Sequence, residues 1–180
     1  IWSRDRRTYS YAKDGNIFIA SVNDKEPRQL TGKKTDETKD KAEATPDKPK
    51  DDSAKDADKE KKDKERFSVV RLSPKGDWIV ASNKEGLWLM NAASGVKEMI
   101  VKISEEDKES PRYQVIDWSP GADQIYLNYA SRTKWERGVV RYDVKAKKLQ
   151  DIIKDSRLYS GIRLSRDGRT FVFSSGEGNR

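Results

Sequence analysis

The chain contains no cysteine and no histidine among its 180 residues. Without cysteine it can form no disulfide, and it offers no thiol nucleophile or sulfur ligand for a metal. Without histidine it lacks the base of Ser-His-Asp catalysis, which must have a pKa near neutrality. No serine stands in a Gly-x-Ser-x-Gly motif. The sequence therefore predicts no catalytic residue, no cofactor and no metal site in this chain.

Long apolar runs are also missing. None approaches the roughly 20 residues that a transmembrane helix needs, so no membrane span is predicted. Hydrophobic residues make up 33% of the chain and charged residues 38%, where about half and about a quarter are usual. Residues 33–65 account for much of this imbalance, because 23 of these 33 positions are Lys, Asp or Glu. Such a run buries too little apolar surface to offset the entropy of ordering it, and we expect it to be disordered.

The rest of the chain is basic. Outside residues 33–65 it carries 27 Lys and Arg against 19 Asp and Glu, a net charge of +8. Nucleic-acid binding proteins usually gather such charge on one face or in a recognisable motif. Here the basic residues are scattered over turns and strands. We therefore expect no nucleic acid among the partners.

Four segments of the sequence repeat one pattern, in which a large apolar residue precedes Ser and a turn rich in Gly and Asp. The serines are Ser3, Ser73, Ser119 and Ser165. The second and third serines are 46 residues apart, as are the third and fourth. The first and second serines are 70 residues apart, which becomes 37 when the 33 residues of the charged run 33–65 are left out. This period is close to one β-propeller blade.

Each turn is followed by short alternating or apolar runs with further turns between them, which is typical of antiparallel strands. We expect strands at 78–82 and 124–129, directly after two of the Ser motifs, and a closing strand of the first unit at 28–31. The sequence predicts an all-β fold, namely a partial β-propeller of about three to four four-stranded blades. We assign residues 1–32 to a first, incomplete blade, 66–103 to the second, 104–155 to the third and 156–180 to the start of a fourth, with 33–65 as the disordered insertion. Trp2, Leu72, Trp118 and Leu164 are expected to pack between neighbouring blades.

The motif Leu72-Ser-Pro-Lys-Gly-Asp77 with Glu85-Gly-Leu-Trp-Leu-Met90 and Arg28-Gln-Leu-Thr31 resembles a known repeat. It is similar to the propeller repeat of TolB-like proteins and of the N-terminal domains of prolyl oligopeptidase family serine peptidases. The peptidase resemblance implies a non-catalytic segment that restricts peptide access to an α/β-hydrolase domain of the same parent chain, absent here. It also implies a periplasmic or secreted location. The alternative is a TolB-like or stand-alone propeller that binds a protein partner.

Carboxylates and one exposed aromatic residue are weighed as functional candidates, and only the aromatic residue and its neighbour are retained. Carboxylates such as Asp123 and Asp167 lie in turns, where an Asp usually bonds its own backbone, and Glu105-Glu106 is most simply a solvated turn. Trp135 differs, because it stands in a polar, expanded turn beside Lys134 and Arg137. Exposed aromatic residues on loops often serve recognition. We therefore predict Trp135 and Arg137 as recognition residues.

Overall fold

The computed structural model describes residues 1–32, 66–103 and 107–176. These residues form antiparallel strands and no helix. The first sheet contains β1 (Thr8–Lys13), β2 (Asn16–Ser21) and β3 (Arg28–Gln29), and the second β4 (Ser68–Leu72), β5 (Trp78–Asn83), β6 (Gly86–Asn91) and β7 (Lys97–Lys102). The third contains β8 (Arg112–Trp118), β9 (Gln124–Ala130), β10 (Arg137–Asp143) and β11 (Lys148–Asp155), and the last β12 (Leu158–Leu164) and β13 (Phe171–Gly176).

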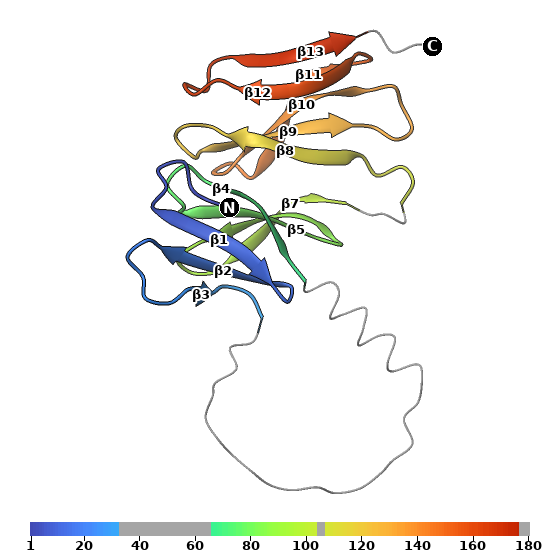
Figure 1. Cartoon of the computed structure of the whole chain (residues 1–180). Helices are drawn as coiled ribbons and strands as arrows, with labels where there is room; N and C mark the ends of the chain where they lie inside the picture. Colours follow the sequence, from blue (N-terminus) through green and yellow to red (C-terminus); the bar gives the residue numbers. More distant parts are fainter. Residues whose placement is uncertain (33–65, 104–106, 177–180) are drawn as a thin grey trace, which may run out of the picture.

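The four sheets follow one another in a stack, in the order of the sequence (Figure 1). Within each sheet, strands that are neighbours in sequence pair with each other. The first strands of adjacent sheets also lie next to one another, since β4 contacts both β1 and β8, and β8 contacts β12. This arrangement confirms the predicted all-β class and the partial β-propeller. The blade limits given above stay a prediction.

The repeated serine builds the same turn four times. In each turn the Ser N–H donates to the carbonyl of the residue five positions later, whose own N–H donates back to the Ser Oγ, at 2.8–3.0 Å. The residue three positions after Ser has a positive φ, which favours glycine but which other residues occasionally adopt in turns. These residues are Arg6, Gly76, Ala122 and Gly168. The sequence repeat is thus a repeat of hydrogen bonds.

Apolar residues fill the spaces between the sheets. On β5 the alternation of side chains sends Ile79 and Ala81 into a cluster with Ile17 of the first sheet. Val80 instead joins a second cluster with Leu127 of the third sheet. Strand β5 is therefore buried on both faces, which explains why it is apolar over consecutive positions rather than alternating.

The prediction that Trp2 packs between two blades is wrong. Trp118 is fully buried and Leu72 nearly so, but Trp2 is 55% exposed, and Leu164 is only half-buried. Trp2 forms an isolated β-bridge with Tyr9 and contacts its ring at 4.9 Å between centroids. Among the described residues, no sheet packs on the far side of the first one. In the described part of the chain, Trp2 therefore has a neighbouring blade on one side only.

The predicted disorder of residues 33–65 concerns residues outside those that the structure describes, as does the Glu105-Glu106 pair. In the described part of the chain, no helix is long and apolar enough to cross a membrane.

Candidate recognition loop

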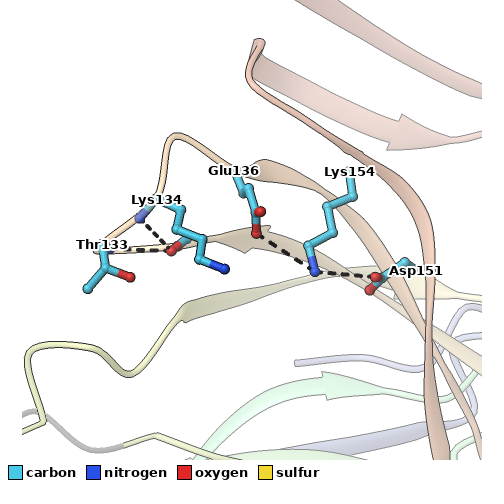
Figure 2. Close-up of polar contacts among 6 residues, drawn as sticks. Thr133, Lys134, Glu136, Asp151 and Lys154 are labelled. Atoms are coloured by element: carbon cyan, nitrogen blue, oxygen red, sulfur yellow. Dashed lines mark hydrogen bonds and ion pairs between the residues drawn. The ribbon is translucent and has the colours of Figure 1, made fainter.

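The loop between β9 and β10, residues 131–136, carries the predicted recognition residue Trp135. Its base is closed by a hydrogen bond from the Ser131 N–H to the Glu136 carbonyl, at 2.9 Å. The Ser131 hydroxyl accepts from the N–H groups of Thr133 and Lys134, at 3.3 and 3.0 Å, and Figure 2 shows these two contacts. A serine at the first position of a turn favours this geometry, because its oxygen replaces a backbone acceptor. The backbone on one side of Trp135 is thereby held in place.

An ion-pair chain holds the other side of the loop. Lys154 Nζ of β11 lies 3.8 Å from a Glu136 carboxylate oxygen and 3.4 Å from one of Asp151, as seen in Figure 2. The hydrogen bond to Asp151, followed by its negative charge, raises the pKa of Lys154. Lys154 therefore keeps its charge. Since these groups are partly exposed, each pair stabilises the fold only weakly.

Aromatic rings continue from this lysine toward the first strand of the sheet. Lys154 Nζ stands 5.3 Å from the centroid of the Tyr129 ring, a distance suited to a cation–π contact. The rings of Tyr129 and Tyr113 are tilted against each other at 5.6 Å. Burial raises the pKa of Tyr113, so its hydroxyl stays protonated at neutral pH.

The two predicted recognition residues are in different environments. Trp135 is 70% exposed, whereas Arg137 is half-buried. Arg137 is the first residue of β10 and pairs with Ala130 of β9 and Asp155 of β11. Trp135 thus presents its ring to solvent, while the backbone of Arg137 is part of the sheet. A role of either residue in recognition stays a prediction.

The carboxylates of the repeated turns are used within those turns. Asp123 accepts a hydrogen bond from Ser119 Oγ, and Asp167 Oδ1 accepts from Ser165 Oγ and from the Arg169 N–H. The Ser165 hydroxyl and then this N–H lower the pKa of Asp167. In the described part of the chain, no three carboxylates gather closely enough to hold a metal ion.

A second feature was missed at the sequence level. A cavity of about 590 Å³ runs along β8 and β12 and reaches Arg71 at the end of β4. Its charged residues are Arg71, Asp117 and Arg163. Their spacing of 46 residues is the spacing of the serines, and this signal could have revealed them as one repeat position.

Comparison with solved structures places this architecture among known folds. A protein assigned as TolB from Agrobacterium tumefaciens aligns with a TM-score of 0.56 and 18% identity, over 98% of this chain and 53% of that protein. The chain has a TolB-like β-propeller fold. TolB from Acinetobacter baumannii aligns with a TM-score of 0.53 and 12% identity, over 93% of this chain and 35% of that protein.

An enzyme also shares this fold. Oligogalacturonate lyase from Vibrio parahaemolyticus aligns with a TM-score of 0.53 and 11% identity, over 90% of this chain and 40% of the lyase. At such identities the likeness concerns the fold alone. The TolB-like chain spans about half or less of the length of these structures. No protein-family model and no curated protein matches its sequence.

Proposed function

We propose that this chain is a non-catalytic propeller segment that binds a polypeptide through the loop of residues 131–136. The observation that carries this proposal is the 70% exposure of Trp135 on a loop held by Ser131 and by the Glu136–Lys154 pair. Tryptophan is enriched among the residues that dominate binding energy at protein interfaces. A loop already fixed in the free protein loses little conformational entropy on binding.

The chemistry of the chain favours binding over catalysis. It has no histidine, and two carboxylates that could act as acid or base, Asp123 and Asp167, are engaged by turn serines. The polypeptide is either a separate protein partner, as for a TolB-like or stand-alone propeller, or a peptide on its way to an enzyme domain.

The second candidate is the accessory role in a prolyl oligopeptidase family serine peptidase. Its support is the resemblance of the Leu72–Asp77 repeat together with the expanded β9–β10 loop and the inserted residues 33–65. The segment would then restrict peptide access to an α/β-hydrolase domain of the same parent chain. Both candidates include a periplasmic or secreted location.

A Gly-x-Ser-x-Gly motif followed by Asp and His in the continuing reading frame would support the peptidase, and the absence of this motif from the complete frame would exclude the peptidase.

Binding through Trp135 can be tested by selecting peptides from a random phage library on the 180-residue chain. The dissociation constant of the best peptide is then measured for the wild type, Trp135→Ala and a control, Trp2→Ala, which also removes an exposed tryptophan. We expect Trp135→Ala to weaken binding about tenfold or more, as for an interface hot spot, and Trp2→Ala to leave it unchanged. Equal affinity of wild type and Trp135→Ala would contradict the proposal.

A further inference from the structure

Three charged residues occupy one position of the repeat and line one cavity. Arg71, Asp117 and Arg163 each precede the apolar residue of the Ser motif and lie near the ends of β4, β8 and β12. These are the first strands of adjacent sheets and lie next to one another in the stack (Figure 1). All three residues border the 590 Å³ cavity, and Gln114, Asn128 and Tyr159 add polar groups to its wall.

A β-bulge precedes each of the three residues. The register of β4 on β5 shifts between Val69 and Arg71, and that of β8 on β9 shifts between Val115 and Asp117. The register of β12 on β13 shifts just before Arg163. Bulges bend a strand and re-aim the next side chain, and they are enriched beside functional sites. The same irregularity at the same repeat position thus accompanies each charged group of the cavity.

The one negative charge in this set is already matched. Asp117 Oδ2 lies 3.2 Å from Arg4 Nη2, and Asp117 Oδ1 accepts the Trp118 N–H at 2.9 Å. This carboxylate is therefore not available to neutralise the two remaining guanidinium groups. With Arg4 included, the cavity keeps a net positive charge.

The two arginines retain unused donors. Arg71 Nη2 donates to the Ile116 carbonyl of the next sheet at 3.0 Å, which fixes the guanidinium across the interface. Its Nε is buried and has no hydrogen-bond partner among the described residues. Arg163 is exposed, and within residues 1–32, 66–103 and 107–176 its side chain makes no hydrogen bond or ion pair. The exposed Arg163 guanidinium can therefore donate charge-assisted hydrogen bonds to an acceptor in the cavity.

We propose that this cavity binds the oxyanion group, carboxylate or phosphate, of an organic ligand between Arg71 and Arg163. Guanidinium groups match the geometry of both oxyanions and bind them through charge-assisted hydrogen bonds. The volume of about 590 Å³ lies within the range of small-molecule sites and exceeds the space that one inorganic ion fills. The site is separate from the Trp135 loop and does not depend on the proposed function.

Calorimetric titration of the 180-residue chain at low ionic strength tests the site with three probes, which are citrate, inorganic phosphate and the peptide Glu-Glu-Glu. Citrate or peptide binding without phosphate binding would assign a carboxylate ligand, and the reverse a phosphate ligand. Absence of binding by all three probes at millimolar concentration would overturn the proposal.

Substitutions locate the bound probe. Arg163→Gln removes an exposed charge and should weaken binding about tenfold or more, the loss of one charge-assisted contact. Arg71→Gln should weaken it at least as much. Asp117→Asn keeps an acceptor for the Trp118 N–H and should tighten binding, because it releases the Arg4 guanidinium from its ion pair and so adds positive charge beside the cavity.

Arg169→Gln is the matched control, since Arg169 is exposed in the turn between β12 and β13 and is not among the residues lining the cavity. The Arg169→Gln variant should bind the probe with the affinity of the wild type. If Arg169→Gln weakens binding as much as Arg163→Gln, the effect reflects net charge and the site is refuted. Unchanged affinity of Arg163→Gln would refute it equally.

Discussion

At each of the four turns, one serine hydroxyl accepts a hydrogen bond from the start of the next strand. In three of them it also donates to an aspartate, as Ser119 does to Asp123. Ser119 is 6% exposed, so its hydroxyl replaces water for the Gln124 N–H at 3.0 Å. A side chain without this oxygen leaves that donor unsatisfied in a nearly dry position.

Ser119→Ala should therefore lower the free energy of unfolding by about 1–3 kcal/mol, the cost of a buried unsatisfied donor. Urea denaturation of the 180-residue chain measures it. Ser174→Ala is the control, because Ser174 is exposed on β13 and its loss should change stability by less than about 0.5 kcal/mol. Equal midpoints for Ser119→Ala and the wild type would show that the turn does not depend on this oxygen.

Tyr142 couples the third sheet to the second. Its hydroxyl donates to Glu98 Oε1 at 3.2 Å, and Lys147 Nζ contacts the other carboxylate oxygen at 2.5 Å. Burial of the ring and then the negative charge of Glu98 raise the pKa of Tyr142 to about 12, from an ordinary value near 10. The folded state thus binds this proton more tightly than the unfolded state.

This raised pKa predicts a pH dependence. The stabilisation by neutral Tyr142 is fully present below about pH 10, and it is lost as the pH rises through about 12. Chemical denaturation at pH 9, 10 and 11 should show a smaller loss of stability for Tyr142→Phe than for the wild type. If both proteins lose stability in parallel over this window, Tyr142 does not carry the effect.

At the scale of strands, the elements were predictable because turn chemistry marks their ends. The expected strand at 78–82 is β5, Trp78–Asn83, and the expected strand at 124–129 is β9, Gln124–Ala130. The Ser motif supplies the start of both strands. The expected strand at 28–31 is only Arg28–Gln29, although Leu30 still donates its N–H to the Ile17 carbonyl.

What escaped prediction depends on how the strands are placed in three dimensions. The repeat position of Arg71, Asp117 and Arg163 changes charge sign from sheet to sheet, so residue type alone does not mark it. The bulges that precede these residues arise from pairing registers, which the sequence pattern does not specify. The burial of Arg137 likewise follows from its pairing with both neighbouring strands.

The close approach of β10 and β11 gives a prediction at this scale. A Cβ at Gly138 would lie 1.7 Å from the Ile153 carbonyl oxygen of the paired strand, whereas a Cβ at Gly176 would meet nothing within 4 Å. Gly138→Ala should therefore force the two strands apart and destabilise the fold by more than about 2 kcal/mol, as overpacking against rigid neighbours does. Gly176→Ala should be neutral. Thermal unfolding compares the two variants, and an unchanged Gly138→Ala would contradict this close contact.

In the molecule as a whole, the outer faces of the first and last sheets differ from the inner faces, because no described sheet covers their apolar side chains. The outer face of the first sheet carries a row of aromatic rings in contact, formed by Trp2, Tyr9, Tyr11 and Phe18. In the last sheet Val172 is 65% exposed. Unpaired apolar faces and sheet edges promote association.

We therefore expect the 180-residue chain to self-associate. Sedimentation velocity should show an average mass that rises with concentration, and Trp2→Ser should reduce this rise by removing part of the aromatic row. Ser174→Ala serves again as the neutral control. A monomer at all concentrations, for the wild type as for Trp2→Ser, would show that these faces do not drive association.

The central claim is that adjacent sheets bury one another face to face, and amide hydrogen exchange of the wild-type chain tests it most directly. Strand β5 packs between the first and third sheets, while β13 is half-buried or exposed throughout. Slow exchange follows from such burial. We predict that amides of β5 exchange far more slowly than those of β13, close to the limit set by global unfolding. Equal rates in β5 and β13 would contradict the stacked-sheet architecture.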